Sequence, residues 1–92
     1  MQLANILLSL GGDDGNTVPK SGITPSEVAV LRVIHGDESV KEIAPYGQVN
    51  RSSRQERQRL VDLYGRNNEG QNTAKAVDML FPGDAARVFE EF

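Results

Sequence analysis

The apolar segment at residues 28–34 constrains the fold of this 92-residue chain more than any other feature. Its side chains are apolar on nearly every side of a helix, and a helix of this kind is buried on most of its faces. The pattern Thr24-Pro25-x-Glu27 places an N-cap, a first-turn proline and a capping box directly before it. We therefore expect a buried central helix over about residues 25–35, which other elements must surround.

Apolar residues at helical spacing predict further helices around this centre. Leu3, Ile6, Leu7 and Leu10 repeat at i, i+3, i+4 and i+7, which is typical of an amphipathic helix. The same spacing, with capping residues at the starts, predicts helices over residues 37–44, from Ser52 or Ser53 to 64, from Asn72 or Thr73 to 80, and over residues 84–92. The expected fold class is all-α: a small bundle of five or six short helices around the central helix.

A stretch rich in Gly, Asp and Asn separates the first expected helix from the central one. Residues 11–22 read GGDDGNTVPKSG, and this composition predicts a flexible loop within a single domain spanning residues 1–92. Asp13, Asp14 and Asn16 offer oxygen ligands, but the two acids are adjacent, and Ser21 stands where a calcium loop needs glutamate. We expect no metal site here.

Composition excludes several classes of protein. The chain has no cysteine, which rules out disulfides, thiolate zinc ligands and a cysteine nucleophile. No apolar run approaches the ~18 residues that span a bilayer, and the opening residues lack the basic region of a signal peptide. We expect a cytoplasmic protein that does not contact membranes.

No set of residues suited to catalysis stands out. His35 is the only histidine, and a Ser-His or zinc mechanism would need partners near it. The carboxylate pairs Asp37-Glu38 and Glu90-Glu91 are sequence neighbours, which do not face one another on a helix. Nucleotide-binding loops and nucleophile elbows are missing as well. We expect a protein that is not an enzyme and that takes no cofactor and no small-molecule ligand.

Positive charge is concentrated in one segment. Residues 50–66 carry five arginines against Glu56 and Asp62, although the whole chain has a net charge of −3. On the expected helix, Arg54 shares a face with Arg57 and Gln58, because residues three and four apart are neighbours. This face predicts a binding surface for phosphates or acidic side chains; the alternative is a solvated basic face. The candidate partner-binding residues are Tyr46, Arg51, Arg54, Arg57, Gln58 and Arg59.

Part of the chain resembles a LuxR-type helix-turn-helix domain. The resemblance covers residues 23–50 and rests on Thr24, Glu27, Val30, Leu31, Gly36 and the run Lys41-Glu42-Ile43-Ala44. It implies that the helix over about residues 52–64 reads DNA, with Arg51, Arg54 and Arg57 directed towards nucleic acid. Arginine suits contacts to phosphate and to guanine.

The acidic composition and the opening LANILLSLGGDDGNTVP make the chain similar in style to short accessory proteins of bacteriophages and prophages. That resemblance implies a structural virion component, an assembly factor or an inhibitor of a host enzyme, located in the host cytoplasm or the virion. Because so short a chain buries only a modest core, a protein partner or self-association would add stability. The leading hypothesis is a non-catalytic protein that acts through protein–protein contacts, and the alternative is helix-turn-helix DNA binding.

Overall fold

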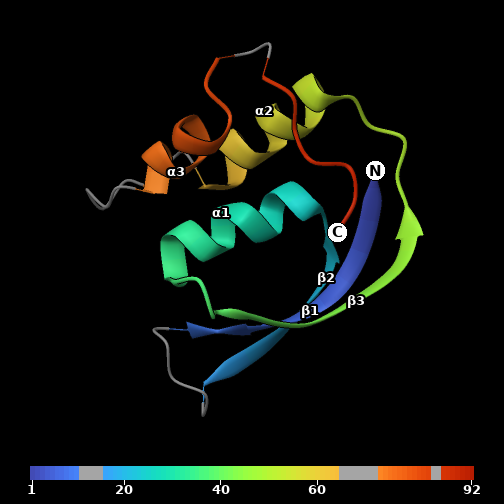
Figure 1. Ribbon diagram of the computed structural model, residues 1–92, viewed down its shortest axis with the longest axis vertical. Helices are drawn as coiled ribbons and strands as arrows, with labels where there is room; N and C mark the ends of the chain where they lie inside the picture. Colours follow the sequence, from blue (N-terminus) through green and yellow to red (C-terminus); the bar gives the residue numbers. More distant parts are fainter. Residues whose placement is uncertain (11–15, 65–72, 84–85) are drawn as a thin grey trace. The chain divides into compact units, whose positions relative to one another are not determined.

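The computed structural model describes residues 1–10, 16–64, 73–83 and 86–92 (Figure 1). Their contacts divide the chain into two compact units, one formed by Met1–Asn50 with Phe89–Phe92 and the other by Arg51–Val88. The first unit holds a β-sheet and one helix, and the second unit holds two helices.

The chain has a mixed α/β fold. The strands β1 (Gln2–Ser9), β2 (Thr17–Ile23) and β3 (Val40–Gln48) form an antiparallel sheet in the order β2-β1-β3. The described helices are α1 (Pro25–His35) in the first unit, and α2 (Ser53–Tyr64) and α3 (Thr73–Leu80) in the second. The prediction of an all-α bundle of five or six helices is therefore wrong, because two expected helices and part of an expected loop are strands.

The N-terminal segment, expected to be a helix, is the central strand β1. Ala4, Ile6 and Leu8 are at most 3% exposed, whereas Asn5 between them is exposed. This alternation is the two-residue period of a strand with one buried face. The apolar run fits both this period and the helical one, and hydrogen bonding to a neighbour on each side favours the strand.

Both edge strands lie where the sequence predicts other structures. β2 takes up residues 17–22 of the predicted loop, whose residues 11–15 lie outside the described part, and β3 begins within the helix predicted over residues 37–44. Pro19 and Pro45 interrupt neither strand, because a proline, which has no N–H to donate, is tolerated at the edge of a sheet. Local turn signals therefore failed to show that these segments pair with β1.

The strand β3 overturns the helix-turn-helix resemblance. The run of residues 41–44, which that motif holds in a helix, pairs with β1 instead. The backbone of Glu42 has a φ of 53°, outside the right-handed helical region, and it lies at a register shift between β3 and β1. The prediction of a helix-turn-helix fold is wrong.

The helix α1 confirms the predicted helix over residues 25–35. The backbone N–H of Glu27 donates to Thr24 Oγ1 at 3.2 Å, which is the expected N-cap bond. The helix contacts β1 and β3 and lies over one face of the sheet (Figure 1), where Val30 and Leu31 are at most 3% exposed. Its second half is less buried than expected, since Val33 is 43% exposed.

The helices α2 and α3 confirm two further predicted helices, and they pack against each other. Ser52 and Gln55 form a reciprocal capping box: the Ser52 N–H donates to Gln55 Oε1 at 2.9 Å, and the Gln55 N–H donates to Ser52 Oγ at 3.1 Å. Ser52 rather than Ser53 is therefore the capping residue. Leu60, Val77 and Phe81 are at most 1% exposed and form the core of this unit.

The C-terminal segment is irregular, and its last residues, Phe89–Phe92, belong to the first unit. Residues 86–92 have no helix, so the helix predicted over residues 84–92 is wrong there, and residues 84 and 85 lie outside the described part. The Gln2 N–H donates to the Glu90 carbonyl at 2.8 Å, and the Phe92 N–H donates to Gln2 Oε1 at 2.8 Å. The Phe89 N–H donates to Ser26 Oγ at 2.7 Å.

Candidate functional site

Four of the six candidate residues line one pocket on α2. This pocket, here called the α2 pocket, has a volume of about 610 Å³, which lies in the usual range for binding sites. Its described lining consists of Arg54, Gln55, Arg57, Gln58, Arg59, Asp62 and Leu63. The helix therefore gathers polar and charged side chains beside one exposed aliphatic side chain.

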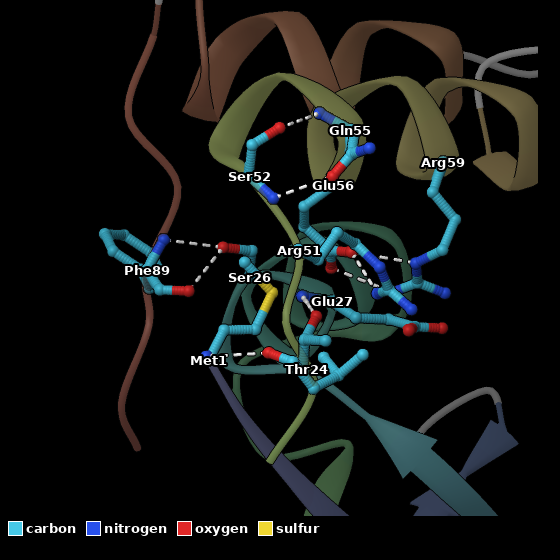
Figure 2. A network of polar contacts seen from close by, with 11 residues as sticks. Met1, Thr24, Ser26, Glu27, Arg51, Ser52, Gln55, Glu56, Arg59 and Phe89 are labelled. Atoms are coloured by element: carbon cyan, nitrogen blue, oxygen red, sulfur yellow. Dashed lines mark hydrogen bonds and ion pairs between the residues drawn. The ribbon is translucent and has the colours of Figure 1, made fainter.

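Glu56 is fully buried and holds two of the candidate arginines. Its Oε1 accepts hydrogen bonds from Arg51 Nη1 at 2.6 Å and from Arg59 Nε at 2.8 Å, and its Oε2 accepts from Arg59 Nη2 at 2.8 Å (Figure 2). The side chains of Arg51 and Arg59 are 25% and 28% exposed. A buried carboxylate must be paired, so these arginines are part of the scaffold of α2. The i, i+3 spacing of Glu56 and Arg59 was the sequence signal for this cluster.

Arg57 connects α2 with the end of α3. It is 8% exposed; its Nε donates to the Phe81 carbonyl at 2.8 Å, and its Nη2 donates to Asp78 Oδ1 at 2.7 Å. Its guanidinium group therefore holds the two helices together, although part of Arg57 also lines the α2 pocket. No local spacing signals this contact, because Asp78 lies in another helix, α3, and Phe81 directly follows that helix.

Arg54 and Leu63 are a charged and an apolar residue of the α2 pocket that are both exposed to solvent. Arg54 is exposed and makes no hydrogen bond or ion pair with any described residue. Gln58 is also exposed, and its Nε2 donates to Asp62 Oδ1 at 3.1 Å. Leu63 is 57% exposed. The pocket thus presents a positive charge that no described residue pairs, beside an exposed apolar side chain.

The candidate residue Tyr46 belongs to the first unit and lies on the edge strand β3. It is 55% exposed, and its hydroxyl lies 3.8 Å from the position that a Cβ on Gly22 would take. Gly22 is in β2, on the other side of the central strand, so the Tyr46 ring reaches across the sheet. Tyr46 is not among the lining residues of the α2 pocket.

The remaining acidic residues and His35 do not assemble a metal site in the described part of the chain. No group of three or more His, Asp or Glu residues there could hold a metal ion. Asp13 and Asp14, the acids of the expected loop, lie outside the described residues. None of the described helices is long and apolar enough to cross a membrane.

His35 does line a second pocket, which lies in the first unit and has a volume of about 520 Å³. The sequence did not predict this pocket, because Ser9, which contributes to it, was placed in a helix.

Comparison with known proteins found no relative: no family model, no curated protein and no solved structure matches the chain.

Proposed function

We propose that this chain is a non-catalytic binding protein that acts through protein–protein contacts and docks an acidic segment of its partner in the α2 pocket. The observation that carries the proposal is Arg54, which is exposed in the pocket and has no partner among the described residues. A guanidinium group pairs in a bidentate manner with a carboxylate, and such a pair is stronger than a hydrogen bond between neutral groups.

The cluster of Glu56 with Arg51 and Arg59, here called the Glu56 cluster, supports an acidic partner. Two arginines surround the one carboxylate of Glu56, so this cluster carries an excess positive charge, and its Arg59 lines the same pocket as Arg54. Because Glu56 already fixes the side chains of Arg51 and Arg59, a partner that approaches this surface orders few additional rotamers, which lowers the entropic cost of binding.

The exposed Leu63 gives the occupant its second property. Leu63 is 57% exposed, so a partner that covers this aliphatic side chain removes apolar surface from water, which stabilises the complex. Since Leu63 and Arg54 line the same pocket, the expected segment carries an aspartate or glutamate close to an aliphatic residue.

The charge balance favours a protein partner over nucleic acid. Binding to DNA depends on neutralising many phosphates, and a chain with a net charge of −3 and Asp62 in the pocket lining is poorly suited to that, whereas a single carboxylate needs only Arg54. Such a binding protein would act in the cytoplasm, or in a virion if a phage encodes it. Virion or prophage genes beside its own gene would support an accessory role of that kind.

A peptide-display library selected on the immobilised full chain tests the proposal. We expect enriched peptides to combine acidic and aliphatic residues, and to bind Arg54→Glu at least about tenfold more weakly, a difference of ~1.4 kcal/mol. Arg87→Glu is the matched control, because Arg87 is also exposed but does not line the pocket. It should leave the affinity within about twofold.

Two results would contradict this function. One is that no peptide is enriched over blank support; the other is that the enriched peptides bind Arg54→Glu as tightly as the original chain. Binding of a DNA duplex that weakens steeply with salt and is lost in Arg54→Glu would replace the protein partner with nucleic acid.

A further inference from the structure

A second pocket lies in the first unit, beside the turn that connects α1 to β3. Its volume of about 520 Å³ is sufficient for a small ligand or for one long side chain of a partner. It is lined by Ser9, His35, Lys41 and the turn of residues 36–39. These residues come from the end of β1, the end of α1 and the start of β3, so the pocket is built by the fold of one unit.

Ser9 is the unusual residue of this pocket. It is only 1% exposed, and its Oγ has no hydrogen-bond partner in the described part of the chain. Its backbone N–H is satisfied, since it donates to the Ser39 carbonyl at 2.7 Å. Buried hydroxyl groups almost always have a partner, because leaving one unpaired destabilises the folded state. A hydroxyl in the wall of a pocket that no described residue pairs is therefore available to a bound ligand as its hydrogen-bond partner.

The second serine of this pocket shows which chemistry that partner needs. Ser39 is 3% exposed, and its Oγ donates to the Gly36 carbonyl at 2.7 Å. Its single hydroxyl hydrogen is thereby used, so Ser39 can only accept a further hydrogen bond. A ligand that meets both serines must consequently bring N–H or O–H donors.

The charges around the pocket favour a cation. Asp37 and Glu38 are exposed carboxylates of its lining, and the C-terminal end of α1, which carries partial negative charge, lies directly before them. Lys41 is the cation of the lining, and it is already engaged in an interaction of its own. His35 is the remaining titratable group of the lining.

We propose that this pocket binds an ammonium or guanidinium group, with Ser9 Oγ as the acceptor that the ligand satisfies. The group belongs either to a small organic amine or to a lysine or arginine side chain of a protein, and the chemistry of recognition is the same in both cases. This site is separate from the α2 pocket, with which it shares no lining residue.

The proposal is tested by NMR titration of the isotopically labelled full chain. The cationic probes are methylguanidinium chloride, butylammonium chloride and a short blocked peptide with one arginine, and the anionic controls are acetate and phosphate at equal ionic strength. We expect the cations to shift the backbone signals of Ser9 and of residues 36–39 in a saturable manner, with a Kd of about 1 mM or tighter. Tighter binding of the peptide would identify a protein side chain as the natural ligand, and tighter binding of the free amines would identify a small molecule.

The variant Ser9→Ala shows whether the Ser9 hydroxyl binds the ligand or only supports the fold. Removing an unpaired hydroxyl should raise the Tm of the free protein by about 2–4 °C and weaken binding of the cations at least about fivefold. Ser26→Ala is the matched control, because Ser26 is a buried serine of the same unit whose Oγ is hydrogen bonded to Phe89. This control should lower the Tm and leave cation binding unchanged.

Three results would overturn the proposal. The first is that acetate or phosphate shifts the same signals as strongly as the cations do. The second is that no shift saturates below about 10 mM, which is tenfold weaker than the expected Kd, a loss of ~1.4 kcal/mol. The third is that Ser9→Ala binds the cations as tightly as the original chain or lowers the Tm as Ser26→Ala does.

Discussion

Two buried polar side chains, one in each unit, differ in whether they are hydrogen bonded. Glu56 in the second unit is 0% exposed and receives three hydrogen bonds from Arg51 and Arg59 (Figure 2). Ser9 in the first unit is 1% exposed, and its hydroxyl has no partner among the described residues. A satisfied buried group stabilises the fold, whereas an unsatisfied one destabilises it until a partner arrives. The comparison therefore assigns a structural role to Glu56 and a recognition role to Ser9.

The largest loss of stability is expected when the buried, hydrogen-bonded carboxylate of Glu56 is removed. Glu56→Ala should lower the free energy of unfolding by about 3 kcal/mol, because Arg51 and Arg59 lose the carboxylate that neutralises them. Urea denaturation checks this through a lower midpoint at an unchanged slope. Glu91→Ala, which removes an exposed glutamate, should change the stability by less than about 0.5 kcal/mol. A loss below about 1 kcal/mol for Glu56→Ala would show that the cluster is not part of the scaffold.

A smaller loss of stability is expected at Arg57, whose guanidinium group makes one buried and one partly buried contact. Arg57→Ala should cost about 2 kcal/mol, because the Phe81 carbonyl loses a charged donor at 2.8 Å. Asp78→Ala removes only the other contact, and since Asp78 is 72% exposed it should cost less than about 0.5 kcal/mol. Equal losses in the two variants, measured by urea denaturation, would assign the stabilisation to the ion pair instead.

The sequence predicted the helices of this fold better than its sheet, and the reason is physical. Caps act over three or four residues, so Thr24 with Glu27 and Ser52 with Gln55 mark helix starts wherever the rest of the chain lies. The strands depend on pairing between segments far apart in the sequence. Residues 3–10 satisfy the helical and the strand period alike, and only the neighbours β2 and β3 decide between them.

The candidate site shows the same limit. The exposure of Arg54 follows from the helix alone, and the sequence predicted it as a partner-binding residue. The buried contact of Arg57 could not be predicted, because it joins residues 24 positions apart in sequence. The pocket at Ser9 was missed for a different reason: it needs β1 to be a strand, and the pairing of Ser9 with Ser39 exists only in the sheet.

The smallest change in stability is expected for two buried serines of the first unit, Ser26 and Ser9. They give the most direct comparison of a paired and an unpaired buried hydroxyl group. Ser26 and Ser9 are at most 1% exposed, but Ser26 Oγ accepts from the Phe89 N–H at 2.7 Å and donates to its carbonyl at 3.3 Å. Ser26→Ala should therefore cost about 1 kcal/mol, since two backbone groups lose a hydrogen bond to Ser26, while Ser9→Ala should slightly raise the stability. Both substitutions remove one oxygen atom from a buried site, so the loss of packing is nearly the same. If urea denaturation gives equal losses for the two variants, burial alone sets the effect, and the contrast between paired and unpaired groups carries no information about function.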